Sequence, residues 1–162
     1  HQIALVLESF TGGDISPRLI PDLARLALAE VARQAYIADY FPELLRRHEY
    51  AIKLVREQSR CERGVVYFDL SECDLEAYNK FIPYYLFPDC NYSVGVSRAP
   101  DRVKIAVGSN PWNENATRKN LATICERYGG GGHARVAAIS FAPGQVDLAR
   151  QTAHAIAQEL RG

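Results

Sequence analysis

The 162-residue sequence contains no methionine, and none of its four cysteines lies in a closely spaced CxxC pair. Without such pairs the cysteines do not have the spacing of a zinc site, and a disulfide framework is not expected at this length. The chain also lacks net charge, because Lys+Arg and Asp+Glu both count 19. A neutral chain has no broad attraction for nucleic acid, so any bound anion must be held locally by a few groups.

Long apolar runs are missing as well. No run reaches the roughly 18 residues of a transmembrane helix, and no basic segment precedes an apolar one as in a signal peptide. We therefore expect no membrane partner, and the cysteine usage predicts a reducing, cytoplasmic location. The absent methionine and the start at His1, inside the apolar run HQIALVLESF, predict that the chain is a piece of a longer protein.

Periodicity and turn residues predict an α/β fold in two parts. Residues 1–62 read as a helical connector, in which Ser16 is a candidate N-cap and Pro17 and Pro42 mark helix starts. Residues 63–162 alternate between strands and helices, with a hairpin turn at RAPD and Asn115 as the cap of a helix ending near Tyr128. We expect a mixed sheet of about four to five strands, flanked by helices. The predicted strands cover 64–70, 91–97, 102–109 and 135–141, and a last helix covers 145–162.

Four consecutive glycines stand between a predicted helix and a predicted strand, in YGGGGHARVAA. Gly129 has the position of a helix C′ residue, which accounts for one glycine and not for four. Free backbone N–H groups of such a run can form an anion nest, where His133 could donate to a phosphoryl oxygen and Arg135 could bind one in bidentate fashion. The alternative interpretation is a surface connection with a solvated histidine. The spacing fits neither a P-loop nor a dinucleotide-binding fingerprint.

The stretch YGGGGHARVAAISF resembles the glycine-rich motif of the domain associated with DHH phosphoesterases, called DHHA1. The upstream stretch VKIAVGSNPWNE is similar to the serine-bearing strand end that precedes this motif in some members. The resemblance covers roughly residues 64–162. The segment VAAI at the end of the motif departs from the family pattern, because Ala137 and Ala138 stand where glycine is common. This departure affects the substrate specificity that the resemblance implies.

The resemblance implies a substrate-binding lobe that presents a phosphate or nucleotide to metals held by another lobe. Family substrates include very short oligonucleotides, phosphorylated nucleotides and polyphosphate. By position, the resemblance assigns phosphate or substrate contacts to Gly129, Gly130, Gly131, Gly132, His133, Arg135 and Ser109. We add Trp112 as a residue that could stack on a nucleobase or cap the core.

The Asp-His-His signature of the catalytic lobe is absent from these residues. His48 and His154 fall in helical segments, and Asp69 and Glu72 are the carboxylates near a predicted strand end. We therefore expect no catalytic or metal-binding residue in this chain and no cofactor. The Mn²⁺ or Mg²⁺ of the family would belong to an N-terminal DHH lobe, the expected partner, and the chain alone would be inactive. Homodimerisation stays open.

Two other interpretations remain. The C-terminal domain of alanyl-tRNA synthetase shares this domain type and helps to bind tRNA, although its glycine run usually precedes arginine and it tends to be basic. The chain could also be a small α/β protein whose glycine loop is a mere connection. Aromatic residues in YNKFIPYYLFPDCNY, among them Tyr84, Tyr85 and Phe87, could stack on a base or form a loop packed over the sheet.

Overall fold

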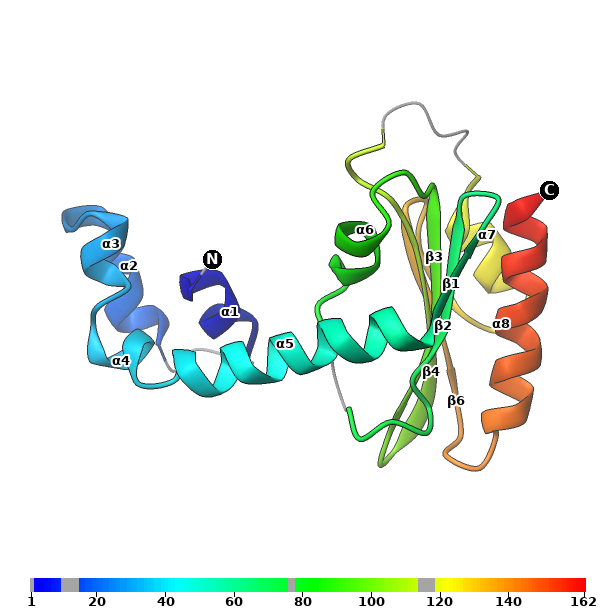
Figure 1. Ribbon diagram of the computed structural model, residues 1–162, viewed down its shortest axis with the longest axis horizontal. Helices are drawn as coiled ribbons and strands as arrows, with labels where there is room; N and C mark the ends of the chain where they lie inside the picture. The colour runs from blue at the N-terminus through cyan, green and yellow to red at the C-terminus, as the bar shows by residue number, and fades with distance from the viewer. Residues whose placement is uncertain (1, 10–14, 76–77, 114–118) are drawn as a thin grey trace. The chain divides into compact units, whose positions relative to one another are not determined.

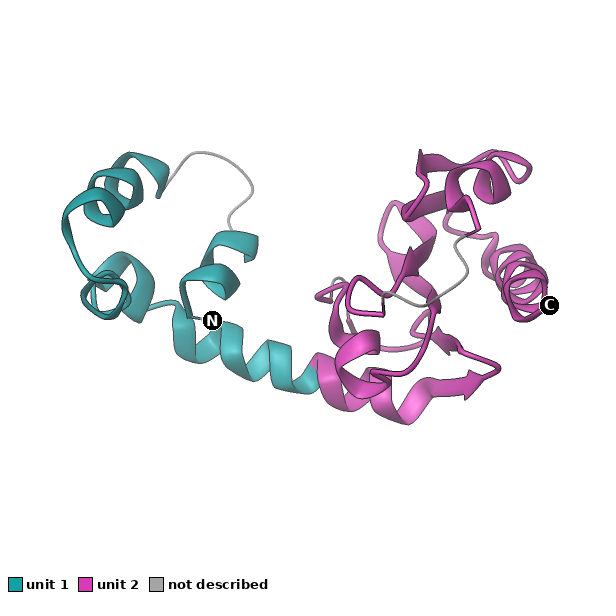
Figure 2. Cartoon of the chain, turned by 90° about the horizontal axis from the view of Figure 1, so that it is seen from above, with its two compact units in different colours: residues 1–50 teal, residues 51–162 magenta. Residues whose placement is uncertain are grey.

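A computed structural model describes residues 2–9, 15–75, 78–113 and 119–162. The chain forms two compact units, His1–Tyr50 and Ala51–Gly162, shown in different colours in Figure 2. The division falls inside helix α5 (Phe41–Gln58), whereas the sequence places a boundary between residues 62 and 63.

The first unit is helical, with a small core around Val6, Ile15 and Ile37. Helix α2 begins at Ser16, the residue that the sequence predicts as its N-cap. Ile15, and not Ser16, is the N-cap residue, because its carbonyl oxygen accepts from the N–H groups of Arg18 and Leu19. The helices of this unit, besides the first part of α5, are α1 (Gln2–Ser9), α2 (Ser16–Arg25), α3 (Leu28–Val31) and α4 (Ala35–Ala38).

The second unit contains a six-stranded sheet in the order β1-β2-β3-β4-β6-β5. Strands β2 and β3 are parallel and every other neighbouring pair is antiparallel, so the predicted mixed sheet is confirmed with slightly more strands than expected. The strands are β1 (Ser59–Glu62), β2 (Val65–Asp69), β3 (Tyr92–Ala99), β4 (Arg102–Ser109), β5 (Gly131–His133) and β6 (Val136–Phe141).

Helices cover the two faces of this sheet differently (Figure 1). Helices α7 (Leu121–Glu126) and α8 (Val146–Arg161) pack on one face, where Ile105 and Ile139 meet Ile156 in the larger core. The end of α5 and the short α6 (Ile82–Leu86) pack on the opposite face, around Phe68 and Tyr84. Strand side chains alternate between the two faces of a sheet. In β2, for example, Val65 points into the larger core and Phe68 points toward α6.

Helix α7 is shorter than the predicted helix. Its N-cap is Asn120, whose side chain accepts a hydrogen bond from the Thr123 N–H at 3.3 Å. Asn115, the predicted cap, lies outside the described residues. None of the helices in the described ranges is both long and apolar enough to cross a membrane.

Candidate functional site

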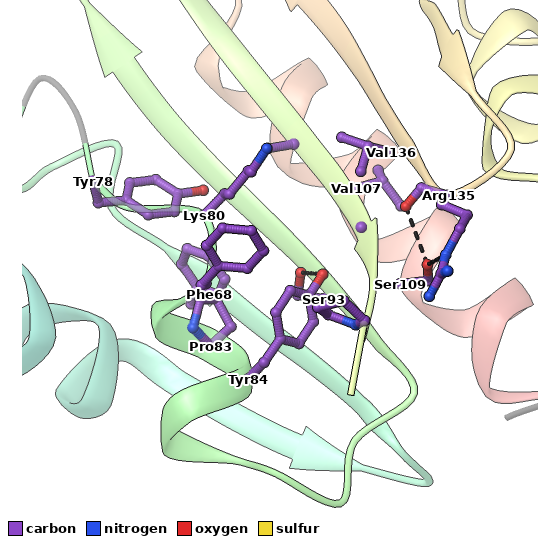
Figure 3. Close-up of a pocket in the computed structure, with 14 residues that line it drawn as sticks. Phe68, Tyr78, Lys80, Pro83, Tyr84, Ser93, Val107, Ser109, Arg135 and Val136 are labelled. Carbon is purple, nitrogen blue, oxygen red and sulfur yellow. Dashed lines mark hydrogen bonds between the residues drawn. The ribbon is translucent and has the colours of Figure 1, made fainter. Parts of the chain in front are cut away.

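A pocket of about 320 Å³ opens between α6 and the α6 face of the sheet (Figure 3). Phe68 of β2 and Tyr84 of α6 contribute rings to it, and Val136 of β6 lines its far side. A volume near 300 Å³ lies at the small end of the range for ligand pockets, about 300–1,000 Å³. The pocket is therefore large enough for a small ligand.

Small residues in the strands make room for these rings. A side chain at Gly95 of β3 would overlap the ring of Phe68, and one at Gly108 of β4 would overlap the hydroxyl of Tyr84. Glycine in a strand interior commonly marks such a close approach. The pocket thus depends on two glycines, one in the middle of β3 and one near the end of β4.

Two hydroxyl groups are paired at the wall of the pocket. The hydroxyls of Tyr84 and Ser93 lie 2.8 Å apart, and either can be the donor. Burial raises the pKa of Tyr84 to about 12, although the Ser93 hydrogen bond acts in the opposite direction. Burial also raises the pKa of Tyr78, which lines the pocket beside Phe68. Both tyrosines therefore keep their phenolic protons at neutral pH.

Two cationic side chains, Lys80 and Arg135, also line the pocket. The Lys80 ammonium lies 5.2 Å from the ring centroid of Phe81. Arg135 Nε donates to the Ser109 hydroxyl at 3.3 Å. Across the part of the chain that the structure describes, neither cation forms an ion pair, and no carboxylate lines the pocket. The pocket wall is therefore apolar with a positive edge, which suits an anionic ligand with an apolar part.

An aromatic edge stands beside this pocket. Trp112 is 62% exposed, and its ring centroid lies 5.7 Å from that of Phe81 and 6.4 Å from that of Tyr84. The buried Asn110 fixes its position, because the Asn110 side-chain oxygen accepts from the Trp112 N–H at 3.0 Å. The Asn110 amide group also donates to two carbonyl oxygens of the chain after α6. One asparagine thus joins the end of β4 to the segment that follows α6.

The glycine run has several separate structural roles. Gly129 adopts φ +75°, and the N–H groups of Gly129 and Gly130 donate to the carbonyl oxygens of Glu126 and Cys125. These two bonds form a Schellman motif at the end of α7, so the expected C′ position of Gly129 is confirmed. They also occupy two of the N–H groups that an anion nest would need.

The remaining glycines lie just before and within edge strand β5. A side chain at Gly130 would overlap the backbone of β6, and one at Gly132, with φ +149°, would lie 2.5 Å from the carbonyl oxygen of Val136. Gly131 differs from both, because a side chain there would meet nothing within 4 Å and its φ is ordinary. Close packing therefore explains Gly130 and Gly132, and the positive φ at the helix end explains Gly129, whereas neither gives a reason for Gly131.

His133 is exposed and lies opposite Val136 in the pairing of β5 with β6. Directly paired residues project from the same face of a sheet, so His133 shares the face of Val136, which lines the pocket. Of the predicted residues, the structure brings Ser109 and Arg135 into the pocket and places Trp112 against its aromatic lining. His133 and Gly131 lie on the adjacent edge strand.

Sequence reasoning missed several lining residues, above all Lys80, Tyr78, Phe68 and Ser93. The available signal was glycine inside predicted strands, at Gly95 and Gly108. Of the aromatics weighed as stacking residues, Tyr84 lines the pocket, whereas Tyr85 is exposed on α6.

The remaining titratable candidates have structural partners. Asp69 and Glu72 both bind Arg150 of α8, with N–O distances of 2.7 and 2.9 Å. The His154 ring stacks on Tyr67 at a centroid distance of 4.3 Å. Within the described ranges no three His, Cys, Asp or Glu side chains are grouped so that they could hold a metal ion. The described residues therefore do not fit the metal that the family resemblance implies.

No family model and no curated protein sequence matches the chain. Solved structures do share its fold. A pGpG-specific phosphodiesterase from Vibrio cholerae is similar with a TM-score of 0.73 and 21% identity, covering 87% of this chain and 48% of the other. A DHH domain described as belonging to a family of ribosomal proteins has a TM-score of 0.53 and 15% identity, covering 96% and 41%.

An exopolyphosphatase-related protein from Bacteroides fragilis matches with a TM-score of 0.50 and 11% identity over 93% of this chain and 46% of that protein. The chain therefore spans about half the length of the structures it matches. At these identities the likeness establishes the fold, and the resemblance stated from the glycine-rich motif is confirmed at that level.

Proposed function

We propose that this chain is the substrate-binding lobe of a DHH-type phosphoesterase and holds the phosphate of a short oligonucleotide, a phosphorylated nucleotide or a related compound. The observation that carries the proposal is the pocket beside β5, with Lys80 and Arg135 at its edge and no carboxylate among its described lining residues. Arginine suits this role, because its planar guanidinium binds phosphate oxygens in pairs.

Gly131 supports the same assignment. Its neighbours leave room for a side chain, yet the sequence has glycine there. A ligand lying against the backbone of β5 would explain the missing side chain, because a methyl group would keep it away. His133, two residues further along on the face of Val136, would then donate to a phosphate oxygen from the other side.

Hydrolysis needs ligands for one or two metal ions, and these would come from a separate lobe such as the expected DHH lobe. In this proposal the chain binds and orients the substrate, and a metal held by the other lobe would supply the chemistry of water activation. The 162-residue chain by itself should bind the substrate without cleaving it.

Trp112 provides a direct test, because it is the single tryptophan of the chain and lies beside the pocket. Titration with a 5′-phosphorylated diribonucleotide should change its fluorescence, with calorimetry as an independent measure. Arg135→Ala should weaken binding about tenfold or more, as expected for a lost hydrogen bond to a charged group. Arg102→Ala is the matched control, since Arg102 is exposed at the hairpin turn beside Asp101.

A second pair of variants tests the glycine. Gly131→Ala should weaken binding without lowering the melting temperature, and Gly144→Ala, at another position with nothing within 4 Å, should change neither. Unchanged binding in both Arg135→Ala and Gly131→Ala would contradict the proposal. Preference for a full tRNA over the diribonucleotide would instead favour the synthetase-like interpretation.

A further inference from the structure

We infer that the pocket beside the proposed phosphate site receives a nucleobase, and that the hydroxyl pair of Tyr84 and Ser93 reads the edge of that base. The inference rests on the proposed function and narrows its ligand class. It predicts a nucleobase-bearing ligand and excludes inorganic polyphosphate as the preferred one, because polyphosphate has no apolar part to fill the pocket.

The lining of the pocket matches the chemistry of a base. Phe68, Tyr84 and Val136 offer apolar surface, and Phe81 with Trp112 forms an aromatic edge. Nucleobases stack on aromatic side chains, and such contacts are worth about 1–3 kcal/mol per base. A polyphosphate chain would place charged oxygens against this apolar surface, and the contact would contribute no favourable binding energy.

The hydroxyl pair has unused hydrogen-bonding capacity. Two hydroxyls carry two protons and four lone pairs, and the bond between Tyr84 and Ser93 uses one of each. The residues that the structure describes provide no other hydrogen bond to either side chain. The pair can therefore donate one proton to a ligand and accept another, which is the pattern needed to recognise a base edge.

Burial makes this recognition selective. Tyr84 and Ser93 are 4% and 7% exposed, so water competes little for their hydroxyls. The Tyr84 hydroxyl also lies directly against Gly108, where the strand provides no side chain to cover it. Figure 3 shows the hydrogen-bonded pair of Tyr84 and Ser93. A base that fails to match the pair would leave a buried hydroxyl without a partner, and a site built for hydrogen bonds rejects such ligands strongly.

The position of the cations fits the same ligand. Lys80 and Arg135 line the same pocket as the hydroxyl pair, and Arg135 lies in the turn between β5 and β6. A base between the aromatic rings would thus place its sugar and phosphate toward the arginine and the open backbone of Gly131. The pocket volume of about 320 Å³ suits one nucleoside.

The experiment compares ligands of similar charge on the whole chain by calorimetry. The ligands are the four 5′-phosphorylated homodinucleotides, an abasic dinucleotide of the same length, and tripolyphosphate. The best dinucleotide should bind at least about tenfold more tightly than the worst one, the abasic compound and tripolyphosphate. Tyr84→Phe and Ser93→Ala should reduce the difference between bases to about threefold or less, and should leave binding of the abasic compound unchanged.

Both variants change buried residues, so their melting temperatures are measured first. A second test changes the ligand instead of the protein, so it does not depend on how the variants fold. Exocyclic groups are removed from the preferred base one at a time, and binding to the unaltered chain is measured. Loss of the group that the hydroxyl pair contacts should weaken binding about tenfold. Equal binding of every base and of the abasic dinucleotide would overturn the nucleobase inference and leave the phosphate site standing. Absence of binding by all phosphorylated ligands would contradict the proposed function itself.

Discussion

The backbone N–H of Ser109 donates a 2.9 Å hydrogen bond to the carbonyl oxygen of Arg135, and the hydroxyl of the same serine lies 3.3 Å from the arginine Nε. The main-chain bond fixes the turn between β5 and β6 against the end of β4. The side-chain bond restricts the guanidinium that lines the pocket. Two residues that are far apart in the sequence thus define one part of the proposed phosphate site.

Ser109→Ala should weaken binding of a 5′-phosphorylated diribonucleotide about two- to fivefold, because the hydroxyl's two long hydrogen bonds to Arg135, one with the guanidinium and one with the carbonyl oxygen, are lost. The main-chain bond persists, so the melting temperature should stay the same. Titration calorimetry checks the affinity, and Ser140→Ala on exposed β6 surface is the matched control. A loss of stability without a change in affinity would show that the serine acts on the fold alone.

Gly130→Ala should destabilise the second unit by about 1–3 kcal/mol, because the added methyl group overlaps the β6 backbone and the strands must separate. Urea unfolding followed by Trp112 fluorescence measures this effect. Gly131→Ala, one residue further along in open space, should leave the unfolding midpoint unchanged. Equal midpoints for the two variants would refute the packing explanation of Gly130.

Gly108→Ala should displace the ring of Tyr84 and break its hydrogen bond to Ser93, at a cost of about 1–3 kcal/mol. Discrimination between bases should disappear in this variant even where the chain still folds. Chemical denaturation and the dinucleotide series provide the two measurements. If a folded Gly108→Ala protein kept its preference among bases, the hydroxyl pair would not be the source of that preference.

The contact between Asp69 and Arg150 should make stability depend on pH in acid. Burial alone would raise the pKa of Asp69, but the hydrogen bonds from Ser71 and Arg150 outweigh burial and lower it. A lowered pKa means that the carboxylate stabilises the fold above its unfolded pKa of about 3.9, and that this contribution is lost as pH falls through the folded value.

Asp69→Asn should therefore cost about 1–2 kcal/mol at pH 7, since both side chains are partly buried. The difference from the unaltered chain should shrink as pH falls below about 4. Urea midpoints between pH 7 and pH 3 measure it. Asp101→Asn, at an exposed ion pair, is the control and should change little. A difference that is constant with pH would contradict the assignment.

The sequence predicted much of the sheet, because β2, β3, β4 and β6 carry the β-branched and aromatic runs typical of strands. The other two strands were missed for a physical reason. Ser59–Glu62 is polar and continues a helical pattern, and Gly131–His133 has almost no strand propensity. Both are edge strands that exist because a neighbour pairs with them, and pairing partners are not visible in local sequence.

The candidate site was predicted in part. Arg135 could be placed through the glycine-rich motif and Ser109 through the similar stretch upstream of it, and both line the pocket. Lys80 and Ser93 could not, since their role depends on the packing of α6 against a distant strand. The four glycines also appeared as one feature in the sequence, whereas the structure separates a helix cap, two close backbone approaches and one open position.

The N–H of Leu121, the first residue of α7, donates to the carbonyl oxygen of Ala134 at 3.0 Å, next to Arg135. The start of a helix in the larger core is therefore attached to the turn that carries the arginine. A ligand that immobilises Arg135 should slow amide hydrogen exchange at Leu121, on the face of the sheet opposite to the pocket. Occupancy of the pocket would thus be transmitted through the turn between β5 and β6 to α7 on the other face of the sheet.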